Sequence, residues 1–487
     1  MNPNKNPLLF EINTRVWLKK FGPNTKLDQV PEDFWKELRN RGFHYVWLMG
    51  VWQTSKNSIE KYCFEEGLKK EYTNALPGWQ KKDVIGSPYS IEDYIVNPEL
   101  GGEESLLALK EKLNSVGLKL ILDFVANHFS AESGLIESNP EIFLHGSHDL
   151  LQTDPKTFFE KSGKIFAHGK DPYFDAWGDT LQINYFSQDA RNFMLGRLEK
   201  VAKLCDGVRC DMAMLINNSV FQKTWAVPLS QQNIEQPNSE SWSDAISKIR
   251  KHKEFVFIAE VYWDREWDLQ QLGFDYTYDK KLLDRLKTDD VNEIKTHLWA
   301  DDNFQKRSLR FLENHDEERS AKIFGEQKLK AAATILLTLQ GMRLVNEGQC
   351  DGKLVKLPVQ LGREPKESSN REIRLYYDKL YEITNKEIFR EGRWEPIEPD
   401  PAWEGNNTNG NLLTWLWSYG DERLLVIVNY SNEPSQCSLK FDTKNFEEDI
   451  ELNDVLNDVK YTRSVKEINN IGLYVELQPY KSHIFTY

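Results

Sequence analysis

The chain has 487 residues, a formal net charge of −14 and a sequence pI near 5.3. This length is too great for one simple core, and it fits a barrel of about 250 residues with an insertion and a second domain. The acidic balance argues against binding to nucleic acid or to an anionic membrane surface. No apolar run approaches the ~20 residues of a membrane span and no signal peptide is evident, so we expect a cytoplasmic protein without membrane partners. The five cysteines lack zinc-site spacing, which fits reduced thiols.

Strand-like and helix-like segments alternate over most of the chain, which favours βα units around a parallel sheet. The segments expected as strands are 8–17, 44–52, 120–128, 206–213, 255–263, 274–278, 309–319 and 342–349. Apolar residues at helical spacing mark 32–42, 101–117, 190–204 and 326–341. A set of eight strands is what a closed (β/α)8 TIM barrel requires.

Two regions depart from this alternation. Residues 129–187 are loop-rich and too long for a simple connection, so we expect an inserted subdomain there. After about residue 395 the pattern changes to short alternating β-like runs separated by turns, which predicts an antiparallel β-sandwich. The expected domains are therefore a barrel over 1–128 and 188–394, the insert over 129–187 and the sandwich over 395–487.

Four of the predicted strands end in charged or imidazole side chains. They read LILDFVANH, DGVRCDMA, FVFIAEVYW and LRFLENHDEER. Strands buried on both faces are apolar throughout, so carboxylates belong at their ends. In a parallel barrel the carboxyl ends of the strands form the rim where active sites are built. We therefore expect one composite pocket and an enzyme.

Three carboxylates in these segments suggest a specific chemistry. Asp211 lies two residues after Arg209 on one strand face, so we expect the guanidinium to lower its pKa and leave it ionised as a nucleophile. Aromatic residues follow Glu260 and would raise its pKa to about 6, which suits a general acid. Asp316 adds a third carboxylate. Each has a plainer alternative, namely a structural salt bridge, a solvent-facing Glu and a loop anchor, but together they match retaining glycoside hydrolysis.

The four segments resemble, in order, the four signature regions of the α-amylase family, glycoside hydrolase family 13. The matching motifs are DFVANH, GVRCD, AEVY and NHD. This resemblance implies that Asp211 is the nucleophile, Glu260 the general acid/base and Asp316 the transition-state stabiliser. It also implies substrate contacts from Tyr89, Asp123, His128, Arg209 and His315. The insert and the sandwich would correspond to the family's domains B and C.

Departures from the family pattern narrow the expectation. The residue after Tyr89 is Ser90, where exo-acting α-glucosidases of the family carry an Asp. This difference weakens the interpretation as an exo-acting α-glucosidase. Met214 and its neighbours replace the usual Lys-His pair after the nucleophile, which puts the calcium site in doubt even though Asn127 is present. We expect no required cofactor; a structural calcium stays open but is not supported by the ligand pattern. The eighth strand is expected to end in polar residues that contact ligand or seal the barrel: Arg343, Glu347 and Gln349.

The resemblance implies hydrolysis of α-1,4-glucosidic bonds in maltooligosaccharides or α-glucans through a covalent glycosyl-enzyme intermediate. Two alternatives within the family stay open: an α-glucan transglycosylase resembling 4-α-glucanotransferases, and a disaccharide-specific enzyme. A non-catalytic glucan-binding or membrane-associated relative is disfavoured, because all three carboxylates are retained and no membrane span is found.

Overall fold

The computed structural model describes residues 5–444 and 446–487 and shows a closed barrel of eight parallel strands. Around the barrel the strands follow the order β1-β14-β13-β12-β11-β10-β5-β2. Their bounds are β1 Leu8–Asn13, β2 Phe43–Met49, β5 Lys119–Val125, β10 Gly207–Asp211, β11 Val256–Ala259, β12 Tyr276–Tyr278, β13 Ser308–Arg310 and β14 Met342–Asn346. Each falls within or next to a segment expected as a strand, and the predicted (β/α)8 barrel is confirmed.

The barrel is built from apolar strands and amphipathic helices. Every residue of β2 is buried, as expected for a strand covered on both faces. Helix α5 turns Leu106, Leu109 and Leu113 inward at three- and four-residue spacing. The main helices around the barrel are α2 Glu32–Asn40, α5 Gly102–Ser115, α8 Gln188–Leu204, α9 Asn218–Gln231, α10 Ser241–Arg250, α11 Glu266–Gln271, α12 Lys280–Thr288, α13 Val291–Leu298, α14 Asp302–Lys306, α15 Ser320–Thr338 and α16 Arg371–Thr384.

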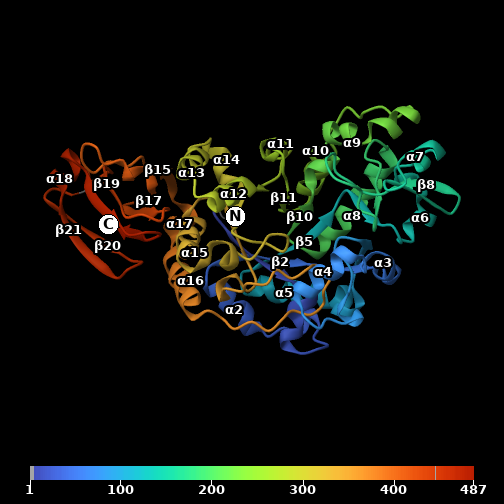
Figure 1. The fold of residues 1–487 in the computed structure, drawn as a ribbon, viewed down its shortest axis with the longest axis horizontal. Coiled ribbons are helices and arrows are strands. Elements are labelled where there is room, and N and C mark those ends of the chain that lie inside the picture. Colours follow the sequence, from blue (N-terminus) through green and yellow to red (C-terminus); the bar gives the residue numbers. More distant parts are fainter. Residues whose placement is uncertain (1–4, 445) are drawn as a thin grey trace.

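Two excursions leave the barrel on the carboxyl side of its strands. The larger one joins β5 to α8 and contains β6 His128–Ser130, α6 Leu135–Ser138, α7 His148–Thr153, β7 Phe158–Lys161, β8 Lys164–Ala167 and β9 Thr180–Gln182. In it β6 pairs with β9 and β7 with β8, both antiparallel. The smaller one follows β2 and contains β3 Trp52–Thr54, α3 Lys56–Tyr62, α4 Glu66–Ala75 and β4 Ile91–Val96. Figure 1 shows the larger excursion at the end of the molecule opposite the C-terminal strands.

The C-terminal part is an antiparallel β domain, as predicted. One sheet has the order β15-β17-β18-β23-β20-β21 and the other β16-β19-β22. The strands are β15 Arg393–Pro396, β16 Asp400–Pro401, β17 Leu412–Tyr419, β18 Glu422–Asn429, β19 Ser435–Leu439, β20 Asp449–Asp454, β21 Val459–Ser464, β22 Leu473–Leu477 and β23 Ser482–Thr486, with helix α18 Val465–Asn470 between β21 and β22 and helix α17 Glu387–Glu391 before β15.

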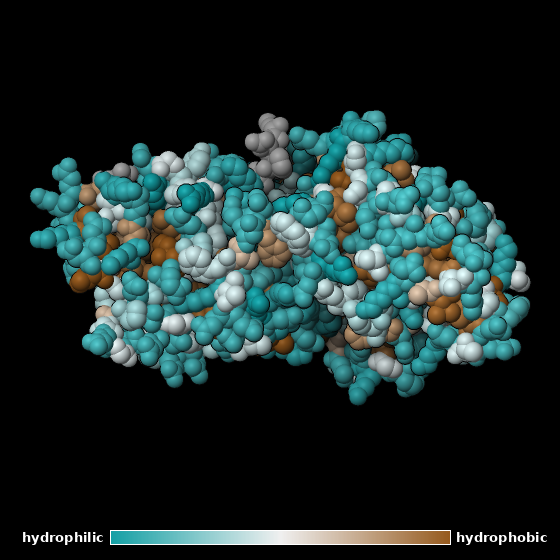
Figure 2. All heavy atoms as spheres, turned by 90° about the horizontal axis from the view of Figure 1, so that it is seen from above, coloured by the Kyte–Doolittle hydropathy of each residue, from teal (hydrophilic) through white to brown (hydrophobic). Residues whose placement is uncertain are grey.

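This domain is attached to the barrel by buried contacts. The Trp417 indole donates to the carbonyl of Thr338 at the end of α15 (2.7 Å), and the Tyr430 hydroxyl donates to the carbonyl of Leu286 in α12 (2.8 Å). The face of the molecule in Figure 2 is largely hydrophilic, with hydrophobic residues in separate groups. Within the described ranges, no helix is both long and apolar enough to cross a membrane, and all five cysteines are unpaired.

Candidate active site

Arg209 is the centre of the predicted site. It lies on β10 directly beside Asp123 of β5, and its side chain is 1% exposed. One guanidinium nitrogen, Nη1, is 2.8 Å from Asp211 Oδ1 and 3.4 Å from Asp123 Oδ1. The other, Nη2, is 2.8 Å from Glu260 Oε2. A single buried cation therefore brings three predicted site carboxylates from three adjacent strands to one point.

The backbone between Asp211 and Glu260 supports the same arrangement. Met212, directly after β10, has φ 41° and ψ 49°, a left-handed conformation that a non-glycine residue rarely adopts. In this conformation its N–H donates to Glu260 Oε2 at 2.7 Å. The Tyr262 hydroxyl donates to the other oxygen, Oε1, at 2.9 Å. The strained residue thus fixes the orientation of Glu260, as is common at functional sites.

Burial decides the pKa values of these carboxyl groups. It raises the pKa of Glu260 to about 7, against the opposing charge of Arg209, and raises the pKa of Asp123 to about 7. The direction expected for Glu260 agrees with this. For Asp211 the expected net lowering of the pKa is wrong: burial raises that pKa by more than Arg209 lowers it. Arg209 still favours the ionised form, because without it the rise would be larger.

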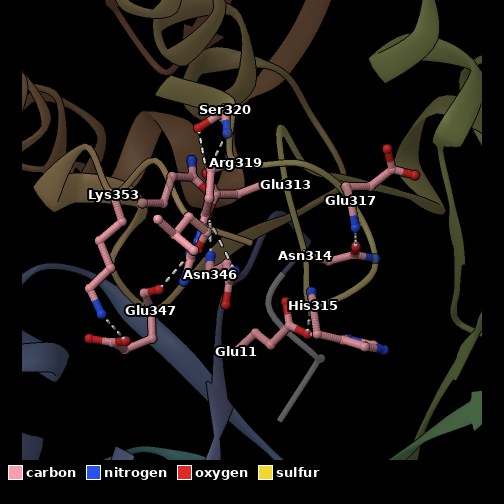
Figure 3. Close-up of polar contacts among 12 residues, drawn as sticks. Glu11, Glu313, Asn314, His315, Glu317, Arg319, Ser320, Asn346, Glu347 and Lys353 are labelled. Atoms are coloured by element: carbon pink, nitrogen blue, oxygen red, sulfur yellow. Dashed lines mark hydrogen bonds and ion pairs between the residues drawn. The ribbon is translucent and has the colours of Figure 1, made fainter. Parts of the chain in front are cut away.

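The opposite wall of the site is organised by His315. Its Nδ1 is 2.6 Å from Glu11 Oε1, and its Nε2 is 2.7 Å from the Tyr89 hydroxyl and 2.9 Å from Asp316 Oδ2. Figure 3 shows the carboxylate of Glu11, the fourth residue of β1, next to His315. The rings of Tyr89 and His315 lie with centroids 5.4 Å apart, and the Arg209 guanidinium is 5.3 Å from the Tyr89 ring. Tyr89 and His315 therefore belong to the same site as Arg209.

These contacts keep His315 positively charged and Asp316 negatively charged. Burial alone would lower the pKa of His315, but the charges of Asp316 and Glu11 raise it to about 10. Partial desolvation of the Asp316 carboxyl group favours a higher pKa, but the charges of His315 and Arg209 hold that pKa at about 2. The Asp316 side chain is 47% exposed, so its carboxylate faces solvent while its partner is buried. The site therefore has one permanently ionised carboxylate beside a charged imidazole.

Glu313 and Glu11 take part in this region although the sequence did not single out Glu11 or give Glu313 a role. Glu313 is fully buried and accepts from Arg319 Nη1 (2.5 Å), from the Ser320 N–H (2.7 Å) and from Asn346 Nδ2 (3.2 Å). This network, drawn in Figure 3, anchors the loop that carries His315 to the start of α15 and the end of β14. The signal available in the sequence was a Glu directly after the apolar run LRFL; the residues that bind its carboxylate could not be read from the chain order.

His128 is the predicted residue closest to the insert. It begins β6, and its ring centroid lies 5.5 Å from that of Trp177. Burial lowers its pKa to about 4, so it is neutral. Ser90 is buried, and its hydroxyl donates to the carbonyl of Asp179 in the insert at 2.8 Å. Ser90 thus ties the β3–β4 excursion to the insert.

The side chain of Asn127 pairs with that of Gln182 in β9. The Asn127 side-chain oxygen accepts from Gln182 Nε2 (3.0 Å), and its amide nitrogen donates to Gln182 Oε1 (3.2 Å). Both ends of the amide are therefore occupied by protein. Across residues 5–444 and 446–487, no group of three or more His, Cys, Asp or Glu side chains is arranged to hold a metal ion.

The polar end expected for the eighth strand is only partly at the carboxyl rim. Arg343 is the second residue of β14. Its guanidinium donates to the carbonyl of Leu337 in α15 and to that of Asn6, which lies just before β1. The expectation that it lies at the strand end is wrong, because the strand begins at Met342. Glu347 pairs with Lys20 (2.5 Å), and Gln349 donates to the Tyr377 hydroxyl (2.8 Å).

The α-amylase catalytic-domain family model, described as "Alpha amylase, catalytic domain", matches residues 36–373, more than half of the chain. The chain belongs to the α-amylase family. Membership supports a glycosidase-type enzyme that acts on carbohydrate. The matched range includes Asp211, Glu260 and Asp316, while Glu11 lies before it.

Relatives and solved structures agree with this assignment. The chain is 22% identical over 452 residues to "Alpha-amylase 3" of Dictyoglomus thermophilum, covering 81% of this chain and 82% of that protein. The structure of a noncanonic maltogenic α-amylase, AmyB, from Thermotoga neapolitana superposes with a TM-score of 0.72 at 21% identity and covers 100% of this chain and 99% of that one. A trehalulose synthase, MutB, superposes with a TM-score of 0.67 at 16% identity, with 99% of each chain covered. Both structures share the fold.

Proposed function

We propose that this α-amylase family protein is a retaining glycosidase that cleaves α-1,4-glucosidic bonds in maltooligosaccharides or α-glucans. The observation that carries the proposal is the bridging of Asp211 and Glu260 by the two Nη atoms of Arg209, each at 2.8 Å. Retaining enzymes need two carboxyl groups close enough for one to attack the anomeric carbon while the other serves the leaving oxygen. Carboxylates that share one guanidinium meet that need.

Asp211 and Glu260 have different roles in the two steps of the reaction. In the first step, protonated Glu260 gives its proton to the glycosidic oxygen, and an oxygen of Asp211 forms a bond to the anomeric carbon as the bond to the leaving group breaks. In the second step, ionised Glu260 takes a proton from water, which attacks the same carbon and releases Asp211. The pKa of about 7 for Glu260 suits both roles near neutral pH.

Asp316 and His315 would act on the positive charge that develops on the sugar. The low pKa of Asp316, about 2, keeps it ionised, so it favours the oxocarbenium-like transition state. Charged His315 holds that carboxylate and can donate to sugar hydroxyls. Tyr89 would pack under the reacting ring, and neutral His128 would face it from the insert side. We place the protein in the cytoplasm as part of the proposal.

A second candidate is transfer of the enzyme-bound sugar to another sugar hydroxyl instead of water. It uses the same residues, because both reactions pass through the same covalent intermediate. The shared fold with a protein described as a trehalulose synthase makes transfer or disaccharide isomerisation the alternatives to test.

The test is incubation with maltoheptaose, maltose, sucrose, trehalose and isomaltose, followed by chromatography of the products. We expect shorter maltooligosaccharides from maltoheptaose, released in the α configuration, and no activity in Asp211→Asn, which keeps the side-chain volume. Products longer than maltoheptaose would favour transfer. Activity on sucrose or trehalose alone would favour a disaccharide-specific enzyme. Full activity in Asp211→Asn, or products of inverted configuration, would contradict the proposed mechanism.

A further inference from the structure

The segment that follows β14 crosses the rim of the barrel and joins the smaller excursion. We call residues 353–364 of this segment the strap. Leu361 forms a single antiparallel β-bridge with Val84, and the Gly362 N–H donates to the carbonyl of Asp83 at 2.7 Å. In Figure 1 the segment runs from the side of α16 toward α4. The strap is therefore paired with the excursion through its backbone.

Side chains hold the strap in the same place. Arg363 and Asp83 form a two-point ion pair, with Nε 3.0 Å from Oδ1 and Nη2 2.8 Å from Oδ2. Leu361 is fully buried in a hydrophobic cluster with Tyr72 and Leu76 of α4. Because a bidentate pair and apolar burial act on neighbouring residues, the strap has one defined position on the excursion.

A buried arginine joins the strap to the barrel. Arg15 lies in α1 Thr14–Trp17, directly after β1, and is 7% exposed. Its Nη2 donates to the carbonyl of Gly86 in the excursion at 2.9 Å and to that of Val359 in the strap at 3.0 Å. One guanidinium therefore connects the strap to the excursion three residues before Tyr89.

The strap lies on the side of the barrel opposite the proposed general acid. In the barrel order β1 is four strands from β11 in either direction, and the strap joins the loops after the two neighbours of β1, which are β14 and β2. Glu260 follows β11 and serves the leaving oxygen, so the leaving part of the substrate lies toward β11. The part that Asp211 retains continues to the non-reducing end of the chain and therefore extends toward the strap.

Little space remains between the strap and the loop that carries His315. A hollow of about 40 Å³ lies there, lined by His315 and, from the strap, by Val355 and Leu357. Such a volume holds a few water molecules but no glucosyl ring. Lys356 also donates to the carbonyl of Asp316, so the strap is bonded to this loop. A sugar chain cannot pass between them.

We propose that the strap closes the cleft on the side of the retained sugar, so that the enzyme acts from the non-reducing end of an α-glucan and releases short products of constant length. This inference rests on the proposed function and names the part of the substrate that the site accepts. Ser90 is 2% exposed and bonded to the insert, so the strap, and not a side chain at that position, limits the retained chain.

The test compares p-nitrophenyl α-maltoheptaoside with the same glycoside carrying an ethylidene acetal on its non-reducing glucose. We expect kcat/KM for cleavage, followed by chromatography, to be about 20-fold lower on the blocked glycoside, because its end clashes with the strap. Asp83→Ala/Arg363→Ala loosens the strap and should reduce that ratio about 3-fold or more, with kcat/KM on the unblocked glycoside within about twofold of wild type. Arg393→Ala/Glu395→Ala, which removes an exposed pair in the C-terminal domain, is the matched control and should keep the wild-type ratio.

A binding measurement separates the strap from the proposed function. Calorimetry with Asp211→Asn should give a Kd about 10-fold higher for the blocked than for the unblocked glycoside, whichever reaction the wild type performs. If the wild type cleaves neither glycoside while this difference is found, the proposed function fails and the closure by the strap stands. Equal kcat/KM values or equal Kd values for the two glycosides would overturn the inference. A ratio that Asp83→Ala/Arg363→Ala leaves unchanged would show that the strap does not close the cleft.

Discussion

Replacing Arg209 by Met should destabilise the protein strongly, because it leaves buried carboxylates without their cation. Arg209 contacts Asp211, Glu260 and Asp123 and is 1% exposed. Removing one partner of a buried ion pair costs about 3–5 kcal/mol. Against a total stability of about 5–15 kcal/mol, that is a large share. Met fills much of the Arg volume, so we attribute the loss to charge, and we would measure it by urea unfolding.

The sign of the pH dependence tests this attribution. Glu260 has a folded pKa of about 7, raised from 4.5, so the folded state holds its proton more tightly than the unfolded chain. Loss of Arg209 raises that pKa further, because its charge opposed the rise. At pH 5 Glu260 is protonated with or without Arg209, so the cost of the substitution is smaller there. Above pH 7 the wild-type carboxylate is ionised and paired, and the cost grows with pH until the pH passes the higher pKa of Glu260 in the variant.

Arg393→Met is a suitable control, because the Arg393 side chain is 79% exposed and pairs with Glu395 at the surface. Exposed ion pairs contribute little, so we expect almost no change at either pH. A loss for Arg209→Met that is the same at pH 5 and pH 8 would refute the electrostatic explanation. It would point to packing around the guanidinium instead.

Four further outcomes are expected. The value of kcat/KM should decline above pH about 7 as Glu260 loses its proton, and Glu260→Gln should lower it by about 10²–10⁴-fold and remove that decline. The imidazole of His315 should stay protonated until pH about 10 by NMR and titrate at lower pH in Glu11→Gln; an unchanged titration would contradict the role of Glu11. Gly207→Ala should cost about 1–3 kcal/mol in urea unfolding, because its new Cβ would lie 2.6 Å from a backbone carbonyl oxygen. Gly196→Ala, in α8 with open space around it, should stabilise by about 0.5–1 kcal/mol.

The barrel and the Arg209 centre could be predicted because both follow from local patterns. Apolar runs of strand length marked all eight barrel strands, and the two-residue spacing of Arg209 and Asp211 placed both side chains on one face. The C-terminal strands were visible for the same reason. The small elements of the two excursions, such as β6 and β9, were not assigned, because strands of three residues carry almost no periodic signal.

Contacts between distant segments could not be predicted from the sequence in this way. Glu11 and His315 are 304 residues apart, and only barrel closure brings β1 beside the loop after β13. The ring contact between Tyr173 and Trp263 likewise depends on how the insert meets the barrel. The pKa of Asp211 was misjudged for a related reason: a neighbouring Arg is visible in the sequence, whereas the depth of burial that outweighs it is a property of the fold.

Arg209 and His315 give the carboxyl groups beside them different protonation states. Near Arg209, several buried carboxyl groups share one cation, so burial prevails and the pKa of Glu260 rises to about 7. On the other side, the half-exposed Asp316 carboxylate lies 2.9 Å from the charged imidazole of His315, and its pKa falls to about 2. Environment alone thus prepares one carboxyl group to donate a proton and another to remain anionic. This separation is what acid-assisted departure of a sugar with a developing positive charge requires.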